Sequence, residues 1–127
     1  MLSIELAKEL GKYLEWEPKV GDLTIVYTES GEEVIEPIIP RHEKEKKIVL
    51  SLRNIGDLVW LPRLARLLSE LKTRAPKGFV LGYDQKNNEW YYNDGWFEIR
   101  AANPEDAAAR ALLHFFRHEK QSAADET

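Results

Sequence analysis

Three β-rich runs and the start of a helix follow one another in the stretch GFVLGYDQKNNEWYYNDGWFEIRAANPEDAAARALL (Gly78–Leu113). Strands are predicted at Phe79–Tyr83, Glu89–Tyr92 and Trp96–Ala101, because aromatic and β-branched residues favour strands. The Asn-Asp-Gly sequence at residues 93–95 is typical of a tight hairpin turn. The stretch therefore predicts a three-stranded antiparallel meander.

Two amphipathic helices flank the predicted meander. The later helix is expected to begin with Asn103 as its cap and Pro104 in its first turn, where Glu105 and Asp106 add favourable negative charge. The earlier helix follows Pro62. The apolar stripes are Leu64, Leu67, Leu68 and Leu71 in the earlier helix, and Ala108, Ala111, Leu112, Phe115 and Phe116 in the later one. The order α-β-β-β-α predicts an α+β fold in which the helices cover one or both faces of the meander.

The preceding residues predict an N-terminal helix followed by a β-hairpin. Apolar residues at helical spacing favour a helix from Ser3 to about Glu15, with Ser3 as its cap. Leu23–Thr28 and Val34–Ile39 are expected to pair as a hairpin. Pro37 confines the second of these strands to a sheet edge, because proline lacks the backbone N–H that a central strand needs.

The segment between this hairpin and the meander is predicted to continue with a charged loop at residues 41–47 and a strand at Ile48–Leu52. We expect residues 1–56 to form an N-terminal extension on the same core, residues 57–120 the α-β-β-β-α domain, and residues 121–127 a frayed tail. The hairpin either extends the sheet of the meander or forms a small separate layer.

The chain of 127 residues has the length of one domain and a net charge of −4. Residues 1–40 hold 3 basic and 9 acidic side chains, residues 41–77 hold 10 and 4, and residues 78–127 hold 5 and 9. The absence of cysteine excludes disulfides, thiolate metal sites and a cysteine nucleophile. We find neither an apolar run of membrane-spanning length nor a secretory signal, and we therefore expect a cytoplasmic protein.

Three segments of the chain can be compared with known proteins: WLPRLARLLSEL (Trp60–Leu71), GYD (Gly82–Asp84) and AANPEDAAARALL (Ala101–Leu113). In their order and spacing they resemble small phage and prophage proteins that carry the phage ABA sandwich domain, and ELGKYLEWEPKVGD (Glu9–Asp22) shows a looser likeness. The resemblance covers residues 57–118 and, more loosely, residues 3–22. It implies an antiparallel sheet packed with helices and an origin in a phage or prophage, and it implies no catalytic residue.

Aromatic side chains cluster in the predicted meander, where six lie between Tyr83 and Phe97. Alternation along the third strand places Phe97 and Ile99 on one face and Trp96 and Arg100 on the other. One face is expected to be core. The other is either covered by the helices and the hairpin or available for binding, since aromatic residues are enriched at binding hot spots. The candidate binding residues on this face are Tyr91, Trp96 and Arg100.

A second candidate surface is the basic segment, which consists of Arg41, His42, Lys44, Lys46 and Lys47. A cluster of this kind can contact phosphate or nucleic acid. Glu43 and Glu45 lie between the basic residues, and such interleaved charges favour a solvated loop. The negative net charge of the chain also argues against general nucleic-acid binding.

Sequence motifs for catalysis or cofactor binding are not found. The chain has no G-x-S-x-G elbow, no phosphate loop and no dinucleotide fingerprint. His114 and His118 have a spacing that can place two imidazoles on one metal, but both are expected to face outward without a third ligand. We therefore expect no enzymatic activity, no metal and no cofactor.

These observations support three hypotheses. The first is a non-enzymatic phage accessory protein that acts by binding a host protein or by sequestering a small nucleotide-like ligand. It would serve counter-defence or host takeover in the cytoplasm of the infected or lysogenic host. The second is a nucleic-acid-binding module that uses the basic segment. The third is a structural protein that forms homo-oligomers through edge strands at Val34–Ile39 and Ile48–Leu52.

Overall fold

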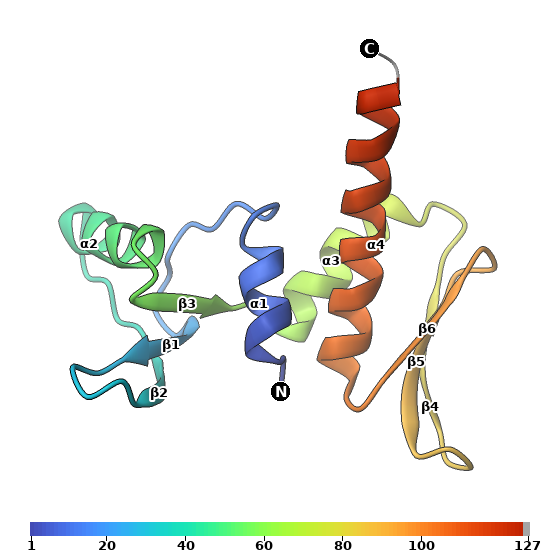
Figure 1. Cartoon of the computed structure of the whole chain (residues 1–127), viewed down its shortest axis with the longest axis horizontal. Helices are drawn as coiled ribbons and strands as arrows, with labels where there is room; N and C mark the ends of the chain where they lie inside the picture. Colours follow the sequence, from blue (N-terminus) through green and yellow to red (C-terminus); the bar gives the residue numbers. More distant parts are fainter. Residues whose placement is uncertain (126–127) are drawn as a thin grey trace.

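A computed structural model describes the backbone of residues 1–125 and the side chains of residues 1–119. Within this part the chain forms four helices and two three-stranded antiparallel sheets. The sheets lie at opposite ends of the molecule, and α1, α3 and α4 lie between them (Figure 1). The α+β class predicted from the sequence is confirmed.

The second sheet is the predicted meander. Its strands are β4 (Val80–Asp84), β5 (Glu89–Asn93) and β6 (Glu98–Ala101), paired in the order β4-β5-β6. The flanking helices are α3 (Leu64–Arg74) and α4 (Pro104–Asp125). All three strands contact α4, and α3 packs on α4 rather than on the sheet. Of the two flanking helices, α4 therefore covers one face of this sheet, and the other face is left to solvent.

The start of α4 also organises the start of the chain. The backbone N–H of Asp106 donates a hydrogen bond of 2.8 Å to Oδ1 of Asn103, which confirms Asn103 as the cap. Ser3 makes no capping bond with its side chain, contrary to the prediction. Its backbone N–H donates instead to Oδ1 of Asp106 at 2.7 Å, so the entry to α1 (Ile4–Leu10) is fixed to the last helix.

The N-terminal hairpin belongs to a separate sheet. β1 (Leu23–Tyr27) pairs with β2 (Glu33–Pro37) as predicted, and β2 lies at the sheet edge. The other neighbour of β1 is β3 (Leu58–Leu61), which the sequence analysis assigned to no strand. All four residues of β3 are buried, and a short apolar run buried on both faces shows no alternation that would mark it as a strand.

The predictions for residues 41–52 are wrong in secondary structure. In place of a charged loop and a strand at Ile48–Leu52, the chain forms one helix, α2 (Glu43–Asn54). Alternating glutamate and lysine suit a helix because residues three and four apart lie side by side, and Lys46 pairs with Glu43 at 3.3 Å. The edge strand expected at Ile48–Leu52 is therefore not available for pairing between subunits.

Two further boundaries differ from the predictions. α1 ends at Leu10 rather than near Glu15, and the Arg53 guanidinium of α2 donates to the carbonyl oxygen of Gly11 at 2.6 Å just beyond that end. At the other end of the chain, α4 continues through residues 121–125, where a frayed tail was expected. The rest of that tail, residues 126–127, lies outside the described residues.

The core surrounds the first half of α4. Leu10 of α1, Leu67 of α3 and Leu112 of α4 have no exposed surface. Four alanines of α4 are also fully buried: Ala107, Ala108, Ala109 and Ala111. Because these alanine side chains are small, α1, α3 and the β4-β5-β6 sheet can all approach α4 closely, and Arg110 and His114 lie on its exposed side.

We expect Asp106→Ala to lower the free energy of unfolding by about 1–3 kcal/mol, because the substitution leaves the Ser3 N–H without its acceptor. Urea denaturation measures the change. The matched control is Glu105→Ala, which removes only a 3.7 Å ion pair with the α-amino group of Met1 and should cost less than about 1 kcal/mol. Equal losses in the two variants would contradict the role given to Asp106.

Candidate functional site

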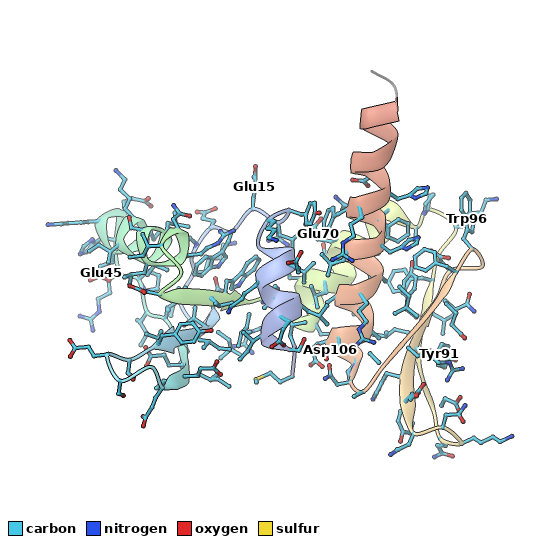
Figure 2. The ribbon with its side chains drawn as sticks, in the orientation of Figure 1. Glu15, Glu45, Glu70, Tyr91, Trp96 and Asp106 are labelled. Carbon is cyan, nitrogen blue, oxygen red and sulfur yellow. The ribbon has the colours of Figure 1, made fainter. Side chains whose placement is uncertain are left out.

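The structure separates the candidate binding residues into three places. Trp96 lies in the turn between β5 and β6, whereas Tyr91 lies further along β5 (Figure 2). The basic segment lies at the opposite end of the molecule, where Figure 2 labels Glu45 of α2. Only Tyr91 and Arg100 are brought together, as cross-strand neighbours in β5 and β6.

The predicted pairing of Trp96 with Arg100 on one strand face is wrong. β6 begins at Glu98, so strand alternation does not extend back to Trp96. The backbone N–H groups of Trp96 and Phe97 both donate to Oδ1 of Asp94, at 2.9 and 3.2 Å, and hold these residues in the turn. The Trp96 side chain is 83% exposed, the largest exposed fraction among the large hydrophobic residues described.

Trp96 forms one wall of a cleft of about 300 Å³. The opposite wall is the loop from α3 to β4, and α4 contributes a half-buried phenylalanine. The lining residues are Arg74, Ala75, Pro76, Lys77, Gly78, Asp94, Trp96 and Phe115. The cleft is mostly apolar and lies beside an exposed indole, which makes it the candidate site for an apolar or aromatic group.

The sequence analysis identified one residue of this cleft, Trp96, as a binding candidate. Residues 75–77 lie between the predicted earlier helix and the meander and were not identified as binding candidates, and Phe115 was assigned to the apolar stripe of the last helix. Phe115 is in fact half-buried and reaches the cleft from α4. No local pattern signals the site, because its walls come from three elements that are distant in sequence.

Asp94 makes the turn below Trp96 rigid. Oδ2 of Asp94, the carboxylate oxygen that does not bind the turn backbone, accepts a 2.8 Å hydrogen bond from the hydroxyl of the fully buried Tyr92. Burial acts to raise the pKa of Asp94, but hydrogen bonds from the Trp96 N–H, the Tyr92 hydroxyl and the Phe97 N–H outweigh it and lower that pKa below its ordinary value. Burial, together with Asp94, raises the pKa of Tyr92, so its hydroxyl remains a donor.

The two cations at the cleft differ in how they are paired. Arg74 binds Glu70 at 2.9 Å and Glu119 at 3.4 Å, and its guanidinium lies 4.4 Å from the ring centre of Phe116. Within residues 1–119, no carboxylate pairs with Lys77, which is exposed. Lys77 is therefore the cation at the rim that remains available to an anionic group.

Tyr91 and Arg100 occupy the uncovered face of the β4-β5-β6 sheet. The Tyr91 ring lies against Gly82, where a Cβ atom would come within 2.6 Å of it, and the Arg100 guanidinium lies 5.8 Å from the ring centre. Arg100 Nη1 binds Asp84 at 2.8 Å, and this bond raises the pKa of Arg100 and lowers that of Asp84. Two further carboxylates surround Arg100, so this face is acidic and poorly suited to phosphate.

The basic segment lies at the start of α2 and is partly neutralised by its own acids. Lys46 lies 3.3 Å from Glu43 and 3.8 Å from Glu17, and His42 lies 3.5 Å from Glu45. In the described side chains, no ion pair is found for three members of the segment: Arg41, Lys44 and Lys47. The remaining positive charge is carried by Arg41 just before α2 and by Lys44 and Lys47 on α2.

His114 and His118 are both exposed on α4, as expected from the sequence. Their rings stack with centres 5.9 Å apart. With Ile99, Arg110 and Arg117 they line a groove of about 330 Å³. The two guanidinium groups beside the imidazoles disfavour a bound cation.

No family model matches the chain, and neither a curated protein nor a solved structure does so. None of the helices within the described residues is long and apolar enough to cross a membrane.

We expect Asp94→Ala to lower the free energy of unfolding by about 1–3 kcal/mol at neutral pH, because the buried Tyr92 hydroxyl loses its acceptor. Since the folded pKa of Asp94 lies below the unfolded value of about 3.9, this stabilisation is complete above pH 3.9 and is lost as the pH falls through the folded pKa. Urea denaturation of both proteins across this range measures the difference. A difference that does not change down to about pH 2 would contradict this assignment.

Proposed function

We propose that the chain is a non-enzymatic binding protein whose partner inserts an apolar or aromatic group into the cleft beside Trp96. The observation that carries the proposal is the indole of Trp96, 83% exposed above an apolar cleft. A tryptophan that is exposed to this extent adds little to the core, and tryptophan is among the residues that most often dominate binding energy.

The rigidity of the turn supports this proposal. Asp94 fixes the backbone at Trp96 and Phe97, and it is itself held by Tyr92 of the core. A side chain that is positioned before binding loses less conformational entropy when a partner arrives. The turn therefore holds the backbone that carries Trp96 at the rim of the cleft before a partner arrives.

The resemblance to small phage proteins suggests where the partner is found. The region of resemblance, residues 57–118, contains the residues that line the cleft, and these residues lie between or just after the three segments that carry the resemblance. We therefore propose a phage accessory protein that acts on a protein of its host, in counter-defence or host takeover. In this proposal, binding at the cleft blocks the surface of the host protein that it covers.

Lys77 favours a second candidate partner, a small nucleotide-like ligand. The apolar walls would accept a planar base, and Lys77 would contact its phosphate at the rim. A volume of about 300 Å³ is at the lower end of the range for small-molecule sites. Both candidates require the same chemistry in the cleft, a flat apolar group, and they differ in what the group is attached to.

We expect Trp96→Ala to abolish binding while changing the free energy of unfolding by less than about 0.5 kcal/mol, since the side chain is exposed. Native mass spectrometry of protein purified from an infected host measures binding, and urea denaturation measures stability. The matched control is Ile55→Ala, which removes a 71% exposed side chain just after α2, at the far end of the molecule.

The expected result is an added mass on the wild type and on Ile55→Ala that Trp96→Ala lacks. An added polypeptide identifies a host protein, and an added mass of a few hundred daltons identifies a small ligand. A mass retained by Trp96→Ala, or a bare wild-type protein, would contradict the proposal. Unfolding of Trp96→Ala would contradict it as well.

The nucleotide candidate has its own test, a titration of the chain with adenosine monophosphate and with adenosine. We expect the monophosphate to bind more tightly than the nucleoside, by about tenfold for one charged hydrogen bond. In Lys77→Ala this difference should disappear while the affinity for adenosine is unchanged. Equal affinities in the wild type would exclude a phosphate contact at Lys77.

A further inference from the structure

The outer edge of β2 carries backbone groups that no strand within the described residues uses. Hydrogen bonds from Ile38 N–H to Asp22 and from Thr28 N–H to Glu32 bracket the pairing of β1 with β2. Backbone groups in an antiparallel pair point alternately toward and away from the partner. The register therefore directs residues 34 and 36 toward β1 and residues 33, 35 and 37 outward.

The side chains of β2 are exposed along its whole length. Val34 is 39% exposed and Ile35 is 48% exposed, and the two lie on opposite faces of the strand. Ile35 shares its face with the fully buried Ile25 of β1, so the apolar surface of the sheet continues to the free edge. A fourth strand at this edge would cover both apolar side chains.

The charge of the hairpin is uniformly negative. Four glutamates lie in the turn and in β2, at positions 29, 32, 33 and 36, and residues 20–40 contain no lysine or arginine. None of the four forms an ion pair with the side chains of residues 1–119. Pairing of two copies through this edge would bring two such hairpins together without a cation, so the charge opposes self-association here.

We propose that the free edge of β2 is a docking site for an extended, basic segment of a partner protein, which adds to the sheet as a fourth strand. The outward N–H and C=O groups of Glu33 and Ile35 require a strand, because a helix has no free backbone groups to offer them. The glutamates require positive charge in that strand, since opposite charges stabilise cross-strand pairs and like charges destabilise them.

The register specifies the order of residues in the partner. Residues opposite Glu36 and Glu33 are basic, and the two between them, opposite Ile35 and Val34, are apolar. The edge thus selects the pattern basic-apolar-apolar-basic in an antiparallel strand. Pro37 lacks an N–H and limits full pairing to Glu33 and Ile35, which is enough for four residues of the partner.

The test is an NMR titration of the full chain with the capped hexapeptide Thr-Lys-Val-Val-Lys-Thr. We expect the amide resonances of Glu33 and Ile35 to shift more than those of Val34 and Glu36, whose N–H groups already face β1. Trp96→Ala should bind the peptide like the wild type, because the cleft lies at the other end of the molecule. Unchanged binding by Trp96→Ala would show that the peptide binds independently of the cleft, so that the failure of one proposal can be distinguished from the failure of the other.

Two control peptides and two variants isolate the interactions. The first control peptide has glutamate in place of lysine and should not bind. The second is methylated on the backbone nitrogens of its first valine and second lysine, which lie opposite Ile35 and Glu33, and it should not bind either. The double variant Glu33→Lys/Glu36→Lys should weaken binding by about tenfold and should bind the glutamate peptide instead. The matched control Glu5→Lys/Glu15→Lys changes the net charge equally at exposed positions outside the sheet.

Three outcomes would overturn the proposal. The first is binding that both double variants weaken equally, which would indicate a general charge effect. The second is no shift at Glu33 and Ile35 at millimolar peptide. The third is a concentration-dependent shift of these amides without peptide, which would show that a second copy of the chain occupies the edge.

Discussion

The fold depends on the packing of α1, α3 and the β4-β5-β6 sheet around α4. The first half of α4 carries buried alanines where it meets these elements, and its exposed side carries Arg110 and His114. A large or charged residue in place of one of the buried alanines would push these neighbouring elements away from α4. The same packing places Phe115 at the point where α4 leaves the core, next to the β5–β6 turn. Its neighbours in the helix are buried in the core, whereas Phe115 itself lines the cleft.

Because the helices occupy the middle, each sheet is covered incompletely. The β4-β5-β6 sheet is covered by α4 on one face, and its outer face is filled by Tyr91 against Gly82 and by an arginine held among carboxylates. In the β2-β1-β3 sheet β3 is buried, whereas β2 is exposed along its whole length. The two binding surfaces that we propose therefore lie at opposite ends of the molecule, and they differ in kind: the cleft would accept a side chain or base, and the β2 edge would accept a backbone.

The parts of the fold that the sequence predicts are those with local signals. Asn103 and Pro104 mark the start of α4, and the Asn-Asp-Gly turn marks the second hairpin, because each satisfies backbone groups within a few residues. α2 was misassigned because its glutamate and lysine pairs stabilise a helix as well as they solvate a loop. β3 was missed because its burial comes from two helices. One of them, α1, lies far from β3 in sequence, and the other, α2, was itself misassigned. The cleft has the same origin, so only the aromatic residue at its rim was found in advance.

The hydrogen bond between Ser3 and Asp106 joins residues that are 103 positions apart. During synthesis at about 5–20 residues per second, Asp106 is added roughly 5–20 s after Ser3. Until then α4 cannot cover Leu10 of α1, and the apolar residues of the first sheet also remain incompletely covered. Leu10 therefore cannot be covered until α4 has been synthesised, and the segments that precede α4 are exposed to chaperones and proteases until that point.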